Sequence, residues 1–419
     1  MFGGRFSVVG PRGRLGLATS GHRRSKRGSA GPRSHLVAVV GLLALAGAST
    51  GATAAAPGKG PVRVYSFGVV GSGFGPKLLQ FEHVVPTPVA GIPGLVIQVV
   101  TSNSDTYALT RAGSVWAWGA GSTGELGDGK APASAATPIE VHFPHGVKIA
   151  KLANPMPYDS ALAIDIHGVA WGWGFNRHHT VCLPGGEHRT PAPLPLSRVS
   201  LASGAGAHSL LDAAGRVYAC GLGVDGEIGD GSTATRARPT PVVGLPHVGV
   251  ASLVTSWQGS GALMDNGAYY DWGFNKAGQL GDGTRQDSDV PVRVPLRAPV
   301  AAVSQGGSRS NNGQTLALLA DGSLWAWGSG AYGQLGDGSR RDAVSPVAVD
   351  VPAGVRFTEV SSGGDASYAI DATGALWTWG GNQHGQLGDG TTLERLTPGP
   401  TGLVLQGVST TATNAAGLG

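Results

Sequence analysis

The chain has 419 residues, of which 71 are glycine, and its apolar content of 41% is ordinary for a globular protein. Glycine at this level without a period of three indicates many tight turns and excludes a collagen-like chain. The net charge of +4 comes from residues 1–56, which hold eight Lys and Arg and no acidic residue; without them 22 basic residues face 26 acidic ones, a net charge of −4. Basic residues in a leader are no argument that the folded part binds nucleic acid, and we expect no nucleic-acid binding.

Residues 1–56 have the three parts of a secretory signal. A basic region over residues 1–35 precedes the apolar run Leu36–Ala48, and small residues with Ala-x-Ala spacing follow up to Ala56. We therefore expect export and cleavage, and a secreted or cell-surface protein. The alternative is an uncleaved membrane anchor, with residues 36–56 as the only point of membrane association.

A repeated pattern organises residues 57–419. Leu324–Gly338 reads LWAWGSGAYGQLGDG, an apolar segment that ends in Trp-Gly and is followed by a glycine-rich loop. Further copies are Val115–Gly129, Val217–Gly231, Tyr269–Gly283 and Leu376–Gly390, with the shorter Val64–Gly68 and Ala170–Gly174. The glycines that end these apolar segments are 47 to 55 residues apart, so the chain is a single array of repeats of about 50 residues.

A second glycine precedes the Trp-Gly glycine by six residues in the last six repeats, and it predicts a hairpin turn between two short strands. These turn glycines are Gly113, Gly168, Gly215, Gly267, Gly322 and Gly374. Each repeat then contains three or four short strands and shows no helical periodicity. Units of this kind, stacked radially, form a β-propeller.

The two ends of the array complement each other. The array begins at Val62–Gly68, which matches a third strand, and ends at Leu403–Gly419, where Val408-Ser409 and Ala415–Leu418 match the first two strands. The sequence therefore predicts an all-β, seven-bladed propeller over residues 57–419, in which N- and C-terminal strands close one blade.

The pattern resembles the repeats of the regulator of chromosome condensation family, whose hallmark is a Trp-Gly strand followed by Gly-Gln-Leu-Gly. GQLGDG occurs at Gly278–Gly283, Gly333–Gly338 and Gly385–Gly390. The resemblance covers residues 61–419 and is nearest to the alpha-tubulin-suppressor-like bacterial type. It implies a seven-bladed propeller that contacts other proteins through one face of its ring.

Residues that recur in most repeats are expected to serve the fold rather than chemistry. The aspartates of the Gly-Asp-Gly loops are expected to accept backbone N–H bonds in tight turns. They are Asp128, Asp230, Asp282, Asp337 and Asp389. The tryptophans before the Trp-Gly glycine are expected to pack between blades. They are Trp118, Trp173, Trp272, Trp327 and Trp379.

The third repeat is irregular over residues 175–188, where GQLGDG is missing. Its His178, His179, Cys182 and His188 are metal-type ligands. Their spacing matches no zinc-finger pattern, so we expect a loop that has departed from the repeat and holds no metal; a zinc site and a partner contact are the alternatives. Cys182 and Cys220 are the only cysteines, and the sequence leaves their pairing open.

The positions between Trp-Gly and the next glycine vary within a fixed frame, as a binding surface would. Candidate partner-binding residues are Phe175, His178, His179, Phe274, Lys276, Tyr332 and His384. A solvated loop without a ligand is the alternative. We find no catalytic constellation and expect no cofactor and no metal.

We therefore expect a non-catalytic, monomeric, extracellular or surface-attached scaffold that binds an unidentified protein partner. Two alternatives come from the resemblance. One is guanine nucleotide exchange on a small GTPase, and the other is a secreted propeller that inhibits a β-lactamase.

Overall fold

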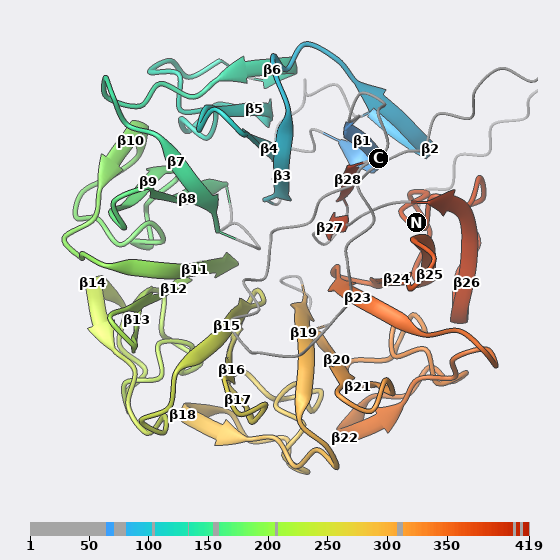
Figure 1. Cartoon of the computed structure of the whole chain (residues 1–419). Coiled ribbons are helices and arrows are strands. Elements are labelled where there is room, and N and C mark those ends of the chain that lie inside the picture. Colours follow the sequence, from blue (N-terminus) through green and yellow to red (C-terminus); the bar gives the residue numbers. More distant parts are fainter. Residues whose placement is uncertain are drawn as a thin grey trace, which may run out of the picture. The chain divides into compact units, whose positions relative to one another are not determined.

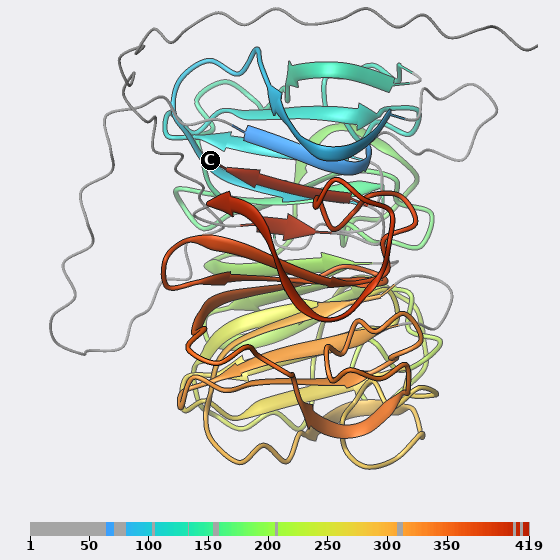
Figure 2. The same ribbon diagram turned by 90° about the vertical axis from the view of Figure 1, so that its right-hand side faces the viewer.

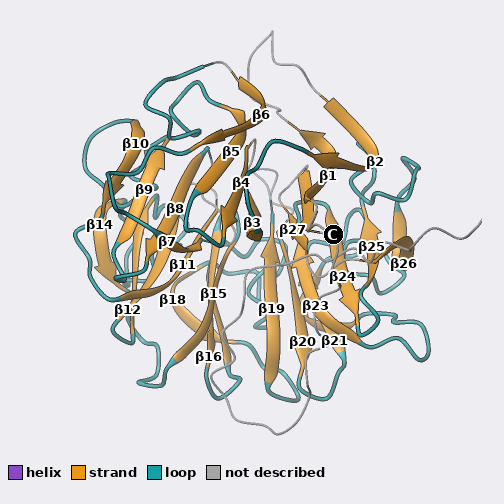
Figure 3. Cartoon of the chain, turned by 45° about the horizontal axis from the view of Figure 1, so that its top comes forward, coloured by secondary structure: helices purple, strands orange, loops and turns teal. Residues whose placement is uncertain are grey.

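The computed structural model describes residues 64–70, 81–102, 105–132, 134–153, 159–205, 208–307, 313–404, 408–410 and 414–418. These residues belong to one compact unit, residues 35–419. They form strands, turns and loops without a helix (Figure 3). Within this part of the chain, no helix could span a membrane. The signal expected in residues 1–56 lies outside the described residues.

Six blades are four-stranded antiparallel sheets, each made of consecutive strands (Figure 1). Blade 1 contains β3 (Val96–Thr101), β4 (Asp105–Thr110), β5 (Val115–Ala120) and β6 (Ser134–Glu140). Blade 2 contains β7 (Ile149–Leu152), β8 (Ser160–Asp165), β9 (Ala170–Gly174) and β10 (His188–Pro193). Blade 3 contains β11 (Val199–Ala205), β12 (His208–Ala213), β13 (Arg216–Gly221) and β14 (Arg236–Pro241).

The remaining blades follow the same plan. Blade 4 contains β15 (Val250–Thr255), β16 (Gly259–Met264), β17 (Tyr269–Gly273) and β18 (Ser288–Arg293). Blade 5 contains β19 (Val300–Gly306), β20 (Gln314–Leu319), β21 (Leu324–Gly328) and β22 (Ala343–Ala348). Blade 6 contains β23 (Phe357–Ser362), β24 (Ala366–Asp371), β25 (Ala375–Gly380) and β26 (Arg395–Val404). In every blade the first strand lies nearest the centre and the fourth lies outermost (Figure 1).

A terminal sheet combines strands from both ends of the array in the order β2-β1-β28-β27. Its members are β1 (Val64–Val70), β2 (Phe81–Val89), β27 (Val408–Thr410) and β28 (Asn414–Leu418). β1 pairs antiparallel with β28, so that Val64 faces Leu418 and Gly68 faces Asn414. Figure 2 shows the red strands from the end of the array beside the blue strands from its beginning.

The prediction of an all-β propeller is confirmed, but the predicted number of seven blades is wrong: the structure has six, each made of consecutive strands. The sequence pattern contained a seventh Trp-Gly-like segment, but that segment supplies only the third-strand position of the terminal sheet. The pairing of N- and C-terminal strands that this register predicted is present.

The second and third strands of each blade are joined by tight turns whose glycines have positive φ angles. Gly267 has φ +77° and Gly322 has φ +83°, which only glycine adopts without strain. The strands flanking these turns are the most deeply buried; all six residues of β16 and of β20 are buried. The hairpins that the spaced glycines predicted are confirmed and form the middle of each blade.

Neighbouring blades are joined by a contact between a tryptophan and a glycine, which we call the indole lock. The indole N–H of Trp379 in blade 6 donates to the main-chain oxygen of Gln334 in blade 5 over 3.0 Å. A Cβ added to Gly336 of the same loop would lie 2.6 Å from Trp379 Nε1. The first glycine of this Gly-Asp-Gly therefore makes room for the next blade's ring.

Three other seams have the indole lock. Trp173 and Trp272 donate to the main-chain oxygens of Glu125 and Glu227, each over 2.9 Å. Trp327 packs over Gly281 in the same way, although its N–H finds no acceptor among the described residues. All four rings of the lock are fully buried, so the tryptophans expected to pack between blades lie in the core. Trp118, at the corresponding position of blade 1, is 3% exposed.

Candidate functional site

One side of the ring carries the long connections of every blade, and we call it the loop face. Because the strands are antiparallel, the connection between the first and second strands emerges on the same side as the connection between the third and fourth. In blade 4 these connections are residues 256–258 and 274–287. The opposite side carries the tight turns and the connections from blade to blade.

Side chains fix the backbone of the longer connection. In blade 4, Asn275 Oδ1 accepts the N–H of Leu280 over 2.9 Å, and Gln279 Oε1 accepts the N–H of Ala277 over 2.8 Å. Blade 6 repeats both contacts through Asn382 and Gln386. The frame is therefore held independently of the side chains that vary within it.

The aspartates of the Gly-Asp-Gly loops complete this frame. Each accepts, over 2.9 to 3.1 Å, the N–H of the residue two positions later. They are Asp128, Asp230, Asp282, Asp337 and Asp389. Asp230 and Asp389 also form ion pairs with Arg236 and Arg395. These carboxylates act in turns, as expected from their recurrence, and each lies in a different blade.

Three of the candidate partner-binding residues lie together at the start of the blade 2 connection. The ring of Phe175 is half-buried, 6.1 Å from the ring of His178, and the Arg177 guanidinium lies 5.9 Å from its centre. His178 is exposed, whereas His179 is half-buried with φ +60°. Arg177 and His178 are therefore exposed beside the half-buried ring of Phe175 on the loop face.

The prediction that Phe274 is an exposed anchor is wrong. Only 9% of Phe274 is exposed: its ring lines a hollow against neighbouring loops, and its N–H donates to Gln258 O over 2.9 Å. Lys276, two residues later, is exposed and forms an ion pair with Asp287 over 2.7 Å. The aromatic side chain therefore supports the loop, and the cation is what the loop presents.

Tyr332 and His384 occupy the same position in blades 5 and 6, four residues after the Trp-Gly glycine. Each is half-buried, and each main-chain N–H donates to the side chain of the glutamine two residues later, over 2.8 and 2.9 Å. The structure therefore distributes the candidate residues along the loop face, one connection per blade, and does not gather them into one pocket.

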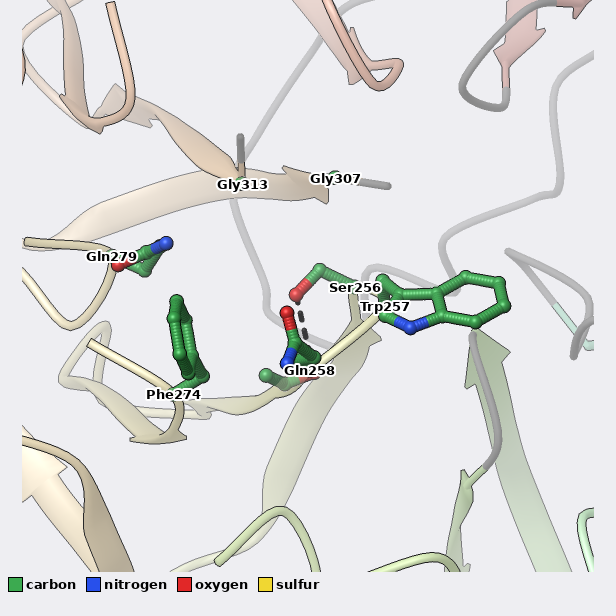
Figure 4. Close-up of a pocket in the computed structure, with 8 residues that line it drawn as sticks. Ser256, Trp257, Gln258, Phe274, Gln279, Gly307 and Gly313 are labelled. Atoms are coloured by element: carbon green, nitrogen blue, oxygen red, sulfur yellow. Dashed lines mark hydrogen bonds between the residues drawn. The ribbon is translucent and has the colours of Figure 1, made fainter. Parts of the chain in front are cut away.

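Trp257, the one tryptophan outside the Trp-Gly strands, is not among the residues predicted to bind a partner. It lies in the first connection of blade 4 and is half-buried. With Gln258, Phe274 and Gln279 it lines an open hollow between blades 4 and 5 (Figure 4). The indole extends away from the Phe274 ring in Figure 4. Its place outside the repeat pattern was the signal that could have identified it, because a residue not required by every blade is available for another role.

The irregular connection of blade 2 keeps the frame of the regular ones, which corrects the expectation that it has departed from the repeat. Val181 donates its N–H to Asn176 Oδ1 over 3.2 Å, as Leu280 does to Asn275. Asn176 Nδ2 also donates to Leu183 O over 2.9 Å. Asparagine maintains the turn although the letters GQLGDG are missing.

Cys182 and Cys220 form a disulfide, with their Cα atoms 5.3 Å apart, which answers the question of pairing that the sequence left open. Cys182 is therefore not a metal ligand. Within the described ranges, no group of three or more His, Cys, Asp or Glu side chains is placed to hold a metal ion.

Two glutamates have markedly raised pKa values because they are buried. Burial raises the pKa of Glu227, in blade 3, to about 7 and that of Glu359, in β23, to about 7. Glu227 stands where blades 4 to 6 have glutamine, and its carboxylate accepts the N–H of Asp225 over 2.9 Å. The hollow beside Trp257 contains no titratable side chain, so neither glutamate belongs to it.

Glu227→Gln is expected to make the protein less sensitive to pH. The pKa of Glu227 is about 7 in the folded protein and 4.5 when the side chain is exposed. Between pH 4.5 and pH 7 the folded protein therefore keeps a proton that the unfolded chain loses, and the free energy of unfolding falls as the pH rises through this range. The full loss amounts to about 3.5 kcal/mol, since one pKa unit corresponds to about 1.4 kcal/mol, and about 2–3 kcal/mol of it falls between pH 5 and pH 8. Free energies of unfolding at pH 5 and pH 8 should therefore differ less in the variant.

Glu394→Gln is the matched control, because Glu394 is a half-buried glutamate that pairs with Arg340 at the surface. This control should keep the pH dependence of the unchanged protein. A Glu227→Gln variant that also keeps it in full would contradict the assignment.

Comparisons with known proteins match this geometry. The family model described as "Regulator of chromosome condensation (RCC1) repeat" matches residues 266–310, 321–370 and 373–409, and a second RCC1 repeat model matches residues 357–386. Among solved structures, human WBSCR16 superimposes with a TM-score of 0.74 at 19% identity, over 85% of this chain and 98% of that one. Prp20p from Saccharomyces cerevisiae gives 0.71 at 21% identity, over 86% and 91%. These two structures support the fold.

Two curated relatives are similar in sequence. The Ultraviolet-B receptor UVR8 of Arabidopsis thaliana is 30% identical over 322 residues, which span 75% of this chain and 71% of the receptor. The E3 ubiquitin-protein ligase HERC2 of Homo sapiens is 32% identical over 248 residues, which span 57% of this chain but 5% of the ligase. With the Trp-Gly strands and the indole lock in place, the chain belongs to the family of proteins built from regulator of chromosome condensation (RCC1) repeats.

Proposed function

We propose that this propeller is a non-catalytic protein-binding scaffold, and that its loop face is the contact surface. The observation that carries the proposal is the combination of a fixed frame with variable side chains. Asn and Gln side chains hold the loop backbones, while Lys276, Tyr332 and His384 differ from blade to blade at the positions the frame leaves open. Aromatic and cationic side chains of this kind are frequent anchors in protein interfaces.

The relatives support a protein partner in general terms. The structural report on Prp20p names its binding to Gsp1p and histones, and another structure shows yeast RCC1 (Prp20) bound to Kap60. For this chain we propose an extracellular or surface partner. The basic and apolar segments within residues 1–56 support export, and a disulfide is typical of oxidising compartments.

The location is tested by fractionation of the producing cells. The protein is expected in the medium or envelope, beginning near Ala56 when its N-terminus is sequenced. A cytosolic chain that retains residues 1–56 would contradict export and would favour nucleotide exchange on a small GTPase, which an exchange assay would then test.

The contact surface is tested by a pull-down with the full chain. Replacing Trp257, Lys276 and Tyr332 by alanine is expected to weaken capture of the partner at least tenfold, because the three lie on the loop face and are not fully buried. Loss of one anchor often costs more than 1 kcal/mol. Affinity is measured by titration of the captured protein.

The control replaces exposed apolar residues of the opposite side, Ile166, Val243 and Val248, by alanine. It also replaces three solvent-exposed side chains by alanine and should leave capture unchanged. A partner that is lost with the control variant and retained by the loop-face variant would place the contact on the opposite side of the ring.

A further inference from the structure

The seam between blades 2 and 3 is the place where the indole lock has no tryptophan. Cys220 occupies the position of the lock tryptophan: in blade 3 Cys220 faces Ser209, as Trp272 faces Ser260 in blade 4 and Trp379 faces Ser367 in blade 6. Cys220 is fully buried, as those rings are. A side chain of one sulfur atom thus fills a position that elsewhere holds a large ring.

The partner position across the same seam has changed as well. Asn176 accepts the N–H of Val181, as Asn275 in blade 4 accepts that of Leu280. The next residue is Cys182 in blade 2 and Gly281 in blade 4, so Cys182 stands at the position of Gly281. Cys182 has φ +60° and Gly281 has φ +63°. The N–H of Cys182 donates to His179 O over 2.9 Å, as that of Gly281 donates to Gly278 O over 3.0 Å.

Both halves of the lock are therefore replaced together, glycine by Cys182 and tryptophan by Cys220. Cys220 Sγ also lies 3.7 Å from Thr180 O, the main-chain oxygen that corresponds to the indole acceptor in other seams. A non-glycine residue at φ +60° is strained by roughly 1–3 kcal/mol. The seam tolerates this strain where the side chain bonds across to the next blade.

We propose that the Cys182–Cys220 disulfide replaces the indole lock and acts as a redox-sensitive latch of the blade 2–blade 3 seam. Reduction by a dithiol breaks the S–S bond: two electrons and two protons pass to the cysteines, and the dithiol becomes a cyclic disulfide. Both cysteines are fully buried, so the dithiol reaches the sulfur atoms only when the seam opens. Once reduced, this seam has neither the covalent bond nor a lock tryptophan, and only the apolar packing and polar contacts of the two blades hold it closed.

The test compares the oxidised protein with protein unfolded and refolded in dithiothreitol, with two free thiols verified by titration. Reduction is expected to lower the Tm by roughly 5 °C or more, given the stabilisation typical of a native disulfide. Hydrogen exchange locates the effect: the amide of Cys182 should exchange much faster after reduction, whereas that of Gly281, at the same position of the blade 4–blade 5 seam, should not change.

Two variants separate a latch from a general stabiliser. Cys182→Ser with Cys220→Ser should have the low Tm of the reduced protein with or without reductant. Cys182→Gly with Cys220→Trp restores the pattern of the other seams; Leu194→Val is added because blades 1 and 5 have Val141 and Val349 there. This variant should have a higher Tm than the serine variant and be insensitive to reductant.

Three results would overturn the proposal. They are an unchanged Tm in the fully reduced protein, equal rises in exchange at Cys182 and Gly281, and a glycine–tryptophan variant that folds but is no more stable than the serine variant. If overpacking prevents that variant from folding, the exchange of the reduced natural protein decides alone.

Discussion

Trp379→Ala is expected to lower the free energy of unfolding by about 3–5 kcal/mol, the usual cost of removing a fully buried aromatic side chain. The ring is fully buried, lies 6.3 Å from the ring of Phe357, and donates to Gln334 of the preceding blade. Its loss therefore leaves a cavity between blades 5 and 6, and Gln334 O keeps only the hydrogen bond from the Ser367 hydroxyl. Denaturation by guanidinium, followed by tryptophan fluorescence and circular dichroism, measures the change.

Trp377→Ala is the control, two residues earlier in the same strand. Trp377 is half-buried, and its indole N–H donates over 2.9 Å to Asp371 of its own blade. The expected loss is about 1–2 kcal/mol, because the cavity opens to water and no seam is broken. Equal losses in the two variants would show that contact between blades contributes nothing special at Trp379.

Gly336→Ala is expected to cost at least about 3 kcal/mol, because two effects add. Gly336 has φ +72°, which costs an alanine roughly 1–2 kcal/mol, and the new Cβ would lie 2.6 Å from Trp379 Nε1 and 2.9 Å from Val349 Cγ1. The ring would have to move away from Gln334. The same denaturation experiment applies.

Gly338→Ala isolates the backbone effect within the same Gly-Asp-Gly. Gly338 has φ +78°, but its nearest neighbour would be Thr397 Cγ2, 4.0 Å from the new Cβ. This variant should lose only the roughly 1–2 kcal/mol of backbone strain. If Gly338→Ala proves as costly as Gly336→Ala, backbone strain alone explains the conserved spacing of glycines within the chain, and the close approach of the ring does not.

The fold could be predicted largely because every repeat needs the same turn glycines and apolar strands, so the same residues recur along the chain. The turn glycines and the Trp-Gly strands gave the hairpins, and the register of the two ends gave the pairing of β1 with β28. Contacts between blades were harder, because they depend on how far apart neighbouring sheets stand. For that reason the sequence could not decide whether Cys182 and Cys220 meet.

The candidate site was predicted less well, for reasons that concern single residues. Phe274 was expected to be exposed because it lies in a loop, but its ring packs against the neighbouring connections and is buried. The blade 2 connection was expected to depart from the repeat because it lacks the sequence GQLGDG, although the side chain of Asn176 maintains the same turn. Trp257 has no counterpart in other blades, so the repeat pattern, which predicted the fold, gave no indication of its position.

The indole lock has a consequence for how such an array can change over generations. The ring belongs to one repeat and the glycine that receives it belongs to the repeat before, as with Trp379 and Gly336. The effect of a substitution in one repeat therefore depends on the residue it contacts in the adjacent repeat. Residues at these contacts should covary between adjacent repeats rather than within one repeat. Cys182 and Cys220 are such a coupled exchange within this chain, and other members of the family that lack a ring at one seam should have lost the facing glycine as well.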